Sequence, residues 1–237
     1  MEKGSVCDLP QSMDAITIGL GWDTGAGEVD LDVSAVLLDS TGGDIETVFF
    51  GRLESPEHGI KHSGDNLTGE GDGDDEQIMV NLTRIGQRVA QVVFVINIYT
   101  RGKSFREVSS PYCRVVENSS GGELCKYALS DAGCESALIV AKIAREAGNR
   151  WGFHALGLPC IGRTWKDSLP HIQRACLQDT RLLMSRGGTH DMSNAPPMSS
   201  QPYSPSLPTT LEDGHAACAN PPVASAPCVE KKTCTVM

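Results

Sequence analysis

The chain has 237 residues, of which 40% are hydrophobic and 5% aromatic, and its 30 acidic and 20 basic residues give a formal net charge of −10. This length allows one domain with a tail or two small domains, and the negative charge argues against a nucleic-acid partner, since binding to phosphates requires an excess of lysine and arginine. No apolar run is long enough for a transmembrane helix or a secretory signal, and nine irregularly spaced cysteines without such a signal predict reduced thiols in a cytoplasmic protein.

The first 160 residues contain mostly short runs of β-branched and apolar residues bounded by Gly, Ser, Asn or Asp. In chain order, strands are predicted at 15–20, 29–38, 47–50, 77–82, 92–99, 112–116, 138–143 and 151–156. The segment 138–143 could instead be helical, but a strand is favoured, with Ala147, Gly148 and Asn149 as a hairpin turn before the next strand. Many short strands with Gly-rich turns predict an all-β sandwich or barrel with few helices.

A helix is predicted at 169–184, followed by a tail without apolar periodicity. Ser168 is the expected N-cap, Pro170 is expected in the first turn, and Gly187 and Gly188 would end the helix. Eight of the thirteen prolines lie after residue 186, among many serines and alanines, so residues 187–237 are predicted to be disordered. The chain is therefore divided into a β-sandwich domain at 1–160, a helical extension at 161–186 and a tail at 187–237.

Two acidic segments account for the charge of the chain. The sequence GDNLTGEGDGDDE at 64–76 holds six carboxylates and neither lysine nor arginine, and Asp23, Glu28, Asp30 and Asp32 form an earlier group. These ten carboxylates match the whole net charge of −10. Asp30 and Asp32 are two residues apart in a predicted strand and so share one face, while Val29, Leu31 and Val33 face the core.

Carboxylates crowded in glycine-rich loops repel one another unless a cation compensates them. Ca²⁺ takes six to eight oxygen ligands in flexible geometry, and it suits such loops better than Mg²⁺, which requires a strict octahedron. Zinc would require His and Cys, and although His58 and His62 lie nearby, neither acidic segment contains a cysteine. The alternative is a solvated acidic loop with no ligand.

Three sequence blocks resemble the signature of the TerD family of tellurium-resistance and general stress proteins, which also includes a slime-mould protein described as cAMP-binding. These blocks are GLGWD at 19–23, DLDVSA at 30–35 and the acidic segment 64–76, and the similarity covers about residues 2–157. The resemblance implies a two-sheet β-sandwich with loops at one end that bind Ca²⁺. It also implies two neighbouring Ca²⁺ ions, held by Asp23, Asp30, Asp32, Asp65, Asn66, Asp72, Asp74, Asp75 and Glu76. Thr68 and Glu70 would ligate an ion or shape the loop.

The last four residues, Cys-Thr-Val-Met, fit a CaaX box in which Cys234 is prenylated, and the final methionine favours farnesyl. One prenyl chain binds membranes only reversibly, so a second signal is expected. Cys228 is a candidate for palmitoylation, and Lys231 and Lys232 add a small basic patch. This motif predicts a eukaryotic member of the family, attached to the cytosolic face of a membrane.

No catalytic motif is present, since the sequence contains neither G-x-S-x-G nor a P-loop. Six carboxylates in one glycine-rich loop suit ion binding better than acid–base catalysis. The sequence therefore predicts a non-enzymatic Ca²⁺-binding module of stress response or signalling, with an unidentified protein partner and no nucleic acid. A module that binds a cyclic nucleotide or another protein is the main alternative, and a hydrolase that uses the acidic loops is a more distant one.

Overall fold

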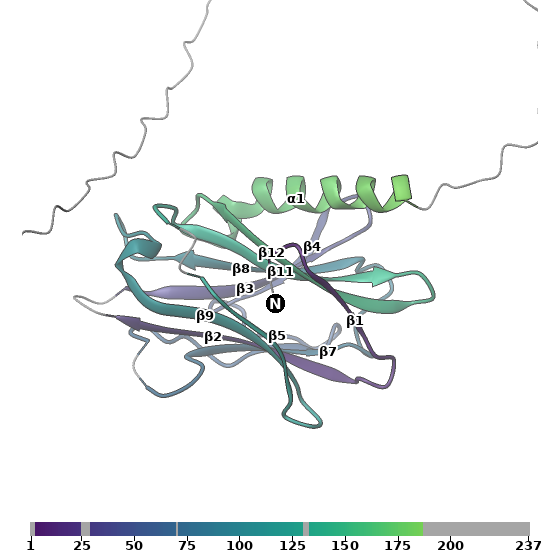
Figure 1. The fold of residues 1–237 in the computed structure, drawn as a ribbon, viewed down its shortest axis with the longest axis horizontal. Coiled ribbons are helices and arrows are strands. Elements are labelled where there is room, and N and C mark those ends of the chain that lie inside the picture. The colour runs from purple at the N-terminus through teal and green to yellow at the C-terminus, as the bar shows by residue number, and fades with distance from the viewer. Residues whose placement is uncertain (1–2, 25–28, 70, 130–132, 187–237) are drawn as a thin grey trace, which may run out of the picture. The chain divides into compact units, whose positions relative to one another are not determined.

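The computed structural model describes residues 3–24, 29–69, 71–129 and 133–186, and there the chain forms two six-stranded antiparallel sheets that face each other (Figure 1). The first sheet has the order β1 (Val6–Leu9), β12 (Arg150–Cys160), β11 (Ala137–Glu146), β8 (Gln91–Ile98), β3 (Leu31–Leu38) and β4 (Asp44–Val48). The second has the order β10 (Glu123–Ala128), β9 (Val108–Glu117), β2 (Ala15–Thr24), β7 (Glu76–Asn81), β6 (Ile60–His62) and β5 (Glu54–Ser55). A short 3₁₀ turn, η1 (Phe105–Glu107), and one helix, α1 (Trp165–Arg186), complete the described fold. The prediction of an all-β, two-sheet sandwich with a C-terminal helix is confirmed.

The main hydrophobic core lies between the two sheets. Val29, Leu31 and Val33 belong to it, as their alternation with the acidic residues predicted. The aromatic side chains of Trp22, Phe94, Trp151 and Phe153 are also buried in this core. Because alternate residues point to opposite faces of a strand, this inward set fixes Asp32 on the outer face of β3.

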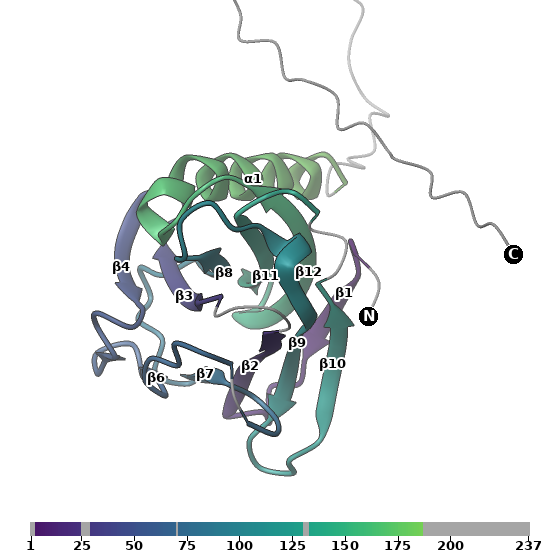
Figure 2. The same cartoon turned by 90° about the vertical axis from the view of Figure 1, so that its left-hand side faces the viewer.

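The helix α1 covers the outer face of the first sheet (Figures 1 and 2). Ile172 and Cys176 of α1 pack against a second cluster that includes Val36, Val93 and Val95. Strands β3 and β8 are therefore buried on both faces along their whole length. This double cover explains why the sequences of these two strands become continuously apolar rather than strictly alternating.

The helix begins four residues earlier than the sequence predicted. It starts at Trp165, and Asp167 Oδ2 accepts hydrogen bonds from the backbone N of Thr164 at 3.0 Å and from the Thr164 hydroxyl at 3.0 Å, which closes a capping pair at Thr164. Ser168 is not the N-cap: its side chain is buried, and its hydroxyl lies 2.9 Å from Asn97 Nδ2. Pro170 lies inside the helix rather than in its first turn. No helix among the described residues combines the length and apolarity needed to span a membrane.

Several strand boundaries also differ from the prediction. The strand expected at 47–50 ends at Val48, because Phe49 and Arg52 exchange backbone hydrogen bonds of 3.0 and 2.8 Å across a turn. Strands β1, β5, β6 and β10 were not predicted. The segment 138–143 is a strand, as favoured. The turn to β12 is a three-residue loop between the paired residues Glu146 and Arg150, with positive φ at Gly148 and Asn149.

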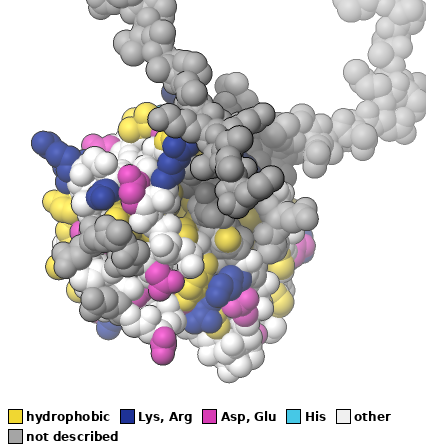
Figure 3. Space-filling model, turned by 60° about the vertical axis from the view of Figure 1, so that its left-hand side comes forward, with side chains coloured by type: hydrophobic (Ala, Val, Ile, Leu, Met, Phe, Trp, Pro, Cys, Tyr) yellow, Lys and Arg dark blue, Asp and Glu magenta, His cyan; other side chains and the backbone are white. Residues whose placement is uncertain are grey.

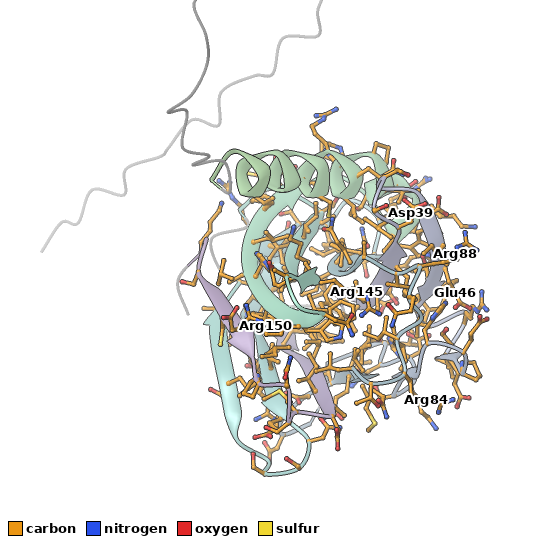
Figure 4. The ribbon with its side chains drawn as sticks, turned by 90° about the vertical axis from the view of Figure 1, so that its right-hand side faces the viewer. Asp39, Glu46, Arg84, Arg88, Arg145 and Arg150 are labelled. Carbon is orange, nitrogen blue, oxygen red and sulfur yellow. The ribbon has the colours of Figure 1, made fainter. Side chains whose placement is uncertain are left out.

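The two ends of the sandwich carry different side chains. The loops with the acidic segments lie at one end, beside the last residues of β2. The side chains labelled in Figure 4, turned so that the right-hand side of Figure 1 faces the viewer, are Arg84, Arg88, Arg145 and Arg150, with Asp39 and Glu46 among them. The Arg145 guanidinium donates hydrogen bonds to the carbonyl oxygens of Ile85, Gly86 and Val89 at 2.8, 3.2 and 2.9 Å. These arginine bonds hold the β7–β8 connection against β11.

Candidate metal centre

Three carboxylates come together where β3 begins. Asp30 directly precedes the strand, Asp32 is its second residue, and Asp65 lies on the loop that leads to β7. One oxygen of each side chain lies within 4.8 Å of the others. Oxygens on opposite sides of a Ca²⁺ ion are about 5 Å apart, because each Ca–O bond is about 2.3–2.6 Å. The triad of Asp30, Asp32 and Asp65 therefore has the spacing of a calcium site.

The triad is electrostatically unfavourable without a cation. Burial raises the pKa of Asp32 from its ordinary value of 3.8 to about 8, with further contributions from Asp30, Glu76 and Asp65. Burial, followed by Asp65 and Glu76, raises the pKa of Asp30 to about 6. In addition, Asp30 Oδ1 is buried without any hydrogen-bond partner. An orphaned carboxylate oxygen in a crowd of negative groups fits a hard divalent cation.

Glu76 lies next to the triad, interacts electrostatically with Asp30 and Asp32, and is fully buried. Its Oε2 accepts a hydrogen bond of 2.8 Å from the backbone N of Val33, and its Oε1 accepts one of 3.3 Å from the backbone N of Asn66. Glu76 thus connects the start of β3 to the acidic loop and adds negative charge beneath the triad. Its two oxygens are engaged by the backbone, so its contribution to an ion is chiefly electrostatic.

His62 is not placed as a metal ligand. Its Nε2 lies 3.1 Å from the carbonyl oxygen of Val33, and its Nδ1 accepts a hydrogen bond of 3.1 Å from the backbone N of Gly64. This pattern assigns the proton to Nε2 and occupies both ring nitrogens. The histidine therefore fixes the loop, and the donor set around the triad stays one of oxygens, which argues for Ca²⁺ rather than zinc.

Asn66 and Asp75 shape the acidic loop. Asn66 Oδ1 accepts hydrogen bonds from the backbone N atoms of Thr68 and Gly69 at 3.1 and 3.0 Å, and Asn66 Nδ2 donates to Asp75 Oδ1 at 3.2 Å. The other oxygen of Asp75 accepts from the backbone N of Trp22 at 2.8 Å. Burial raises the pKa of Asp75 despite this hydrogen bond. Both side chains thus have protein partners that hold the loop against the end of β2.

Asp74 points away from the triad and pairs with Arg114 of β9. The guanidinium binds both carboxylate oxygens, with Nε to Oδ1 at 2.7 Å and Nη2 to Oδ2 at 3.0 Å. The Tyr112 hydroxyl donates to the carbonyl oxygen of Gly73 at 2.6 Å and lies 3.1 Å from Asp74 Oδ1. The Asp74 side chain is only 2% exposed. Asp74 is therefore compensated by a protein cation.

The glycines of the GLGWD block leave room for these contacts. A Cβ atom on Gly19 would overlap the Asp74 carboxylate, and one on Gly21 would overlap the Tyr112 ring. Gly69, at φ +62°, lies against the Trp22 indole and has no space for a side chain. The two glycines of this block thus allow close packing of β2 against the acidic loop and against Tyr112 of β9, and Gly69 allows the loop to pack on Trp22.

Asp23 and Asp72 are exposed and line a surface hollow of about 400 Å³. Tyr112, Arg114 and Lys126 line the same hollow. On a face turned toward this end of the sandwich, the acidic side chains form separate patches with lysine and arginine between them (Figure 3). The structure therefore brings three of the nine expected ligands together and places Asp23 and Asp72 apart from them.

Some functional features were missed by sequence reasoning, and some predicted ones lie outside the described residues. Arg114 was not recognised as the partner of Asp74, although it is a cation inside a short apolar strand. Asn97, a buried amide within the apolar strand β8, was also overlooked. Glu28 and Glu70 of the acidic segments, as well as Cys228 and Cys234 of the tail, lie outside the described residues.

Comparison with known proteins agrees with this architecture. The model of the TerD domain matches residues 1–164. The tellurium resistance protein TerZ of Serratia marcescens is 41% identical over 191 residues, which cover 74% of this chain and 97% of that protein. General stress protein 16U of Bacillus subtilis is 36% identical over 171 residues, which cover 66% of this chain and 88% of that protein. The crystal structure of a telluride resistance protein homologue from Streptomyces coelicolor superposes with a TM-score of 0.59 at 23% identity, covering 65% of this chain and 95% of that one, and so supports the fold.

Proposed function

Because this chain belongs to the TerD family, whose members act in tellurium resistance and stress response, we propose that it is a non-enzymatic Ca²⁺-binding module of a stress response. The observation that carries the proposal is the triad of Asp30, Asp32 and Asp65, in which three carboxylates lie within 4.8 Å and one buried oxygen has no partner. A bound cation would relieve both the mutual repulsion and the orphaned oxygen.

In this proposal the residues of the acidic end have different roles. Asp30, Asp32 and Asp65 would hold one ion directly, while Glu76 and Asn66 keep the loop and the strand in place. Asp23, Asp72 and Asp75 are the candidates for a second ion, because Asp23 acts electrostatically on Asp75 and Asp72 lines the same hollow as Asp23. The pKa shifts of Asp30, Asp32 and Asp75 are all upward. That pattern suits ion binding better than catalysis, which needs an acid and a base with separated pKa values.

Calcium is expected to stabilise the protein against heat. At a free Ca²⁺ concentration one hundred times the dissociation constant, binding to the folded state alone adds about 2.7 kcal/mol. For a domain of this size, that corresponds to a rise in melting temperature of about 5–10 °C. The measurement is thermal unfolding of the full chain in Ca²⁺, in Mg²⁺ and in chelator, combined with calorimetric titration. Mg²⁺ should have a smaller effect.

The result of the same titrations separates this proposal from the main alternative. Equal melting temperatures in Ca²⁺ and in chelator would contradict the calcium site. Calorimetric heat with a cyclic nucleotide in chelator, without any response to Ca²⁺, would instead favour a nucleotide-binding module.

The membrane tether belongs to the same proposal and rests on the sequence motif at 234–237. Prenylation would place the Ca²⁺-binding domain near a cytosolic membrane surface, with Cys228 as a possible second lipid site. Translation of the chain in a eukaryotic lysate with labelled farnesyl diphosphate is expected to label the wild type and the Cys228→Ser variant. The Cys234→Ser variant should stay unlabelled. Absence of label in the wild type would contradict the tether.

A further inference from the structure

A small pocket with a polar floor lies on the outer face of the first sheet, at the N-terminal end of α1. Its volume is about 130 Å³. Asp32, Ser34 and Asn97 line it from the sheet, and Phe49, Phe50 and Trp165 line it from the turn after β4 and from the helix. Asp32 and Asn97 are direct cross-strand partners of β3 and β8, so their side chains lie next to each other on one face.

The floor of this pocket has acceptors that lack donors. Asn97 is fully buried, and its Nδ2 donates to the carbonyl oxygen of Gly162 at 3.0 Å and lies 2.9 Å from Ser168 Oγ. These contacts fix the orientation of the amide and leave Oδ1 without a hydrogen-bond partner. Asp32 is only 5% exposed, and within the described part of the chain no hydrogen bond to its carboxylate is found. Two buried acceptors side by side favour a ligand that donates N–H groups and carries positive charge.

The walls of the pocket are aromatic and partly exposed. The rings of Phe49 and Phe50 meet edge to face with centroids 5.3 Å apart, and the Trp165 ring lies 6.0 Å from that of Phe49. Aromatic faces attract cations and also cover short alkyl chains. Lys166 also lies at the rim, with its Nζ 5.6 Å from the centroid of the Trp165 ring.

We propose that this pocket binds a small primary alkylammonium ion, with its ammonium group on Asp32 and on Asn97 Oδ1 and its alkyl chain between the aromatic rings. The volume of about 130 Å³ holds about four water-sized groups, which suits a chain of a few carbons. A quaternary ammonium fits less well, since it has no N–H to donate to Asn97 Oδ1. This pocket and the calcium site share Asp32 but would bind different ligands, an alkylammonium ion and Ca²⁺.

The test is a calorimetric titration of the full chain with n-butylammonium chloride at pH 9 in chelator, so that Asp32 is ionised and the outcome does not depend on Ca²⁺. We expect saturable binding in the millimolar range. Butan-1-ol, which lacks the charge, and tetramethylammonium, which lacks the N–H donors, should each bind at least about tenfold more weakly. A tenfold difference corresponds to about 1.4 kcal/mol, a magnitude typical of a hydrogen bond to a charged group.

Matched variants decide between this site and nonspecific binding. Asp32→Asn removes the floor charge and should weaken butylammonium binding at least tenfold, whereas Asp44→Asn, which neutralises an exposed carboxylate on β4, should leave it unchanged. Phe50→Ala removes an aromatic ring from the pocket wall and should weaken butylammonium binding. Near-UV circular dichroism checks that the fold persists. Butylammonium binding that equals butanol binding, that survives Asp32→Asn, or that is absent would overturn the proposal. A lysine side chain carries the same group, so comparing N-acetyl-lysine amide with butylammonium distinguishes a protein-borne amine from a free one.

Discussion

Replacing Asp32 with asparagine is expected to stabilise the metal-free protein at pH 8 and to remove most of its stabilisation by Ca²⁺. The pKa of Asp32 is raised by burial and by its acidic neighbours to about 8 in the folded chain, against an ordinary value of 3.8. A carboxyl group whose pKa is raised on folding stabilises the folded state only while it is protonated. This contribution is complete below about pH 4 and is lost as the pH rises toward 8. Asparagine keeps the neutral form at every pH.

The expected gain of the metal-free Asp32→Asn variant at pH 8 is about 2 kcal/mol, a moderate value for relieving a buried, unpaired charge. At pH 4 the variant and the wild type should have similar free energies of unfolding. With saturating Ca²⁺ at pH 8 the order should reverse, because the wild type gains the binding energy and the variant has lost a charged ligand. Urea unfolding at both pH values, with Ca²⁺ and with chelator, measures all four free energies.

Asp44→Asn is the matched control, since it removes an exposed carboxylate at the start of β4. It should change neither the pH dependence nor the response to Ca²⁺. If Asp32→Asn destabilised the metal-free protein at pH 8, Asp32 would have a stabilising protein partner, and the electrostatic account of the triad would be wrong. If the variant kept the full Ca²⁺ response, the ion would bind elsewhere.

The fold was largely predictable because its strands carry local signals. The alternation of Val29, Leu31 and Val33 with acidic residues indicated one buried face, and Gly148 with Asn149 indicated the hairpin between β11 and β12. The strands that were missed lie at the edges of the sheets or beside them, as in β1, β5, β6 and β10. Such strands are short or lack an apolar pattern, and they are specified by pairing with their neighbours rather than by their own composition.

The start of α1 was also set by tertiary contacts rather than by local sequence. Ser168 has the composition of an N-cap, but its hydroxyl is used by Asn97 on β8, 71 residues away in sequence. Thr164 and Asp167, which close the helix start, have a spacing typical of a capping box, with Asp in place of the usual Glu or Gln. Tertiary packing therefore decided between two plausible caps.

The candidate site was predictable in composition but not in its division of roles. The sequence identified the carboxylates. It also predicted that Asp30 and Asp32 share one face, and both belong to the triad that the structure brings together. Carboxylate content alone could not show that Asp74 pairs with Arg114, because that arginine lies 40 residues later on a different strand. Nor could it show that the oxygens of Glu76 accept backbone N–H groups, since this depends on how the loop packs against β3.

Replacing Arg114 with alanine is expected to destabilise the protein by about 3 kcal/mol, since removal of one partner leaves a buried charge uncompensated. The Asp74 side chain is 2% exposed, whereas that of Arg114 is 33% exposed. Most of the lost stability therefore comes from the buried Asp74 carboxylate, which is left without its cation. For a domain of this size, the melting temperature should fall by about 6–12 °C. The double variant with Asp74→Asn should recover part of this loss, because the amide carries no charge and can still accept from Tyr112. Urea unfolding of the two single variants and the double variant gives the coupling energy.

The same variants separate the two roles that Asp74 could have. If Asp74 is held by Arg114, as its bidentate contacts of 2.7 and 3.0 Å indicate, then Arg114→Ala/Asp74→Asn should bind Ca²⁺ with nearly the affinity of the wild type. Asp32→Asn should not, because it removes a member of the triad. A loss of Ca²⁺ affinity in Asp74→Asn as large as that in Asp32→Asn would show instead that Asp74 leaves Arg114 to bind the ion. Arg114 would then compete with Ca²⁺ for this carboxylate, and Arg114→Ala would bind Ca²⁺ more tightly than the wild type.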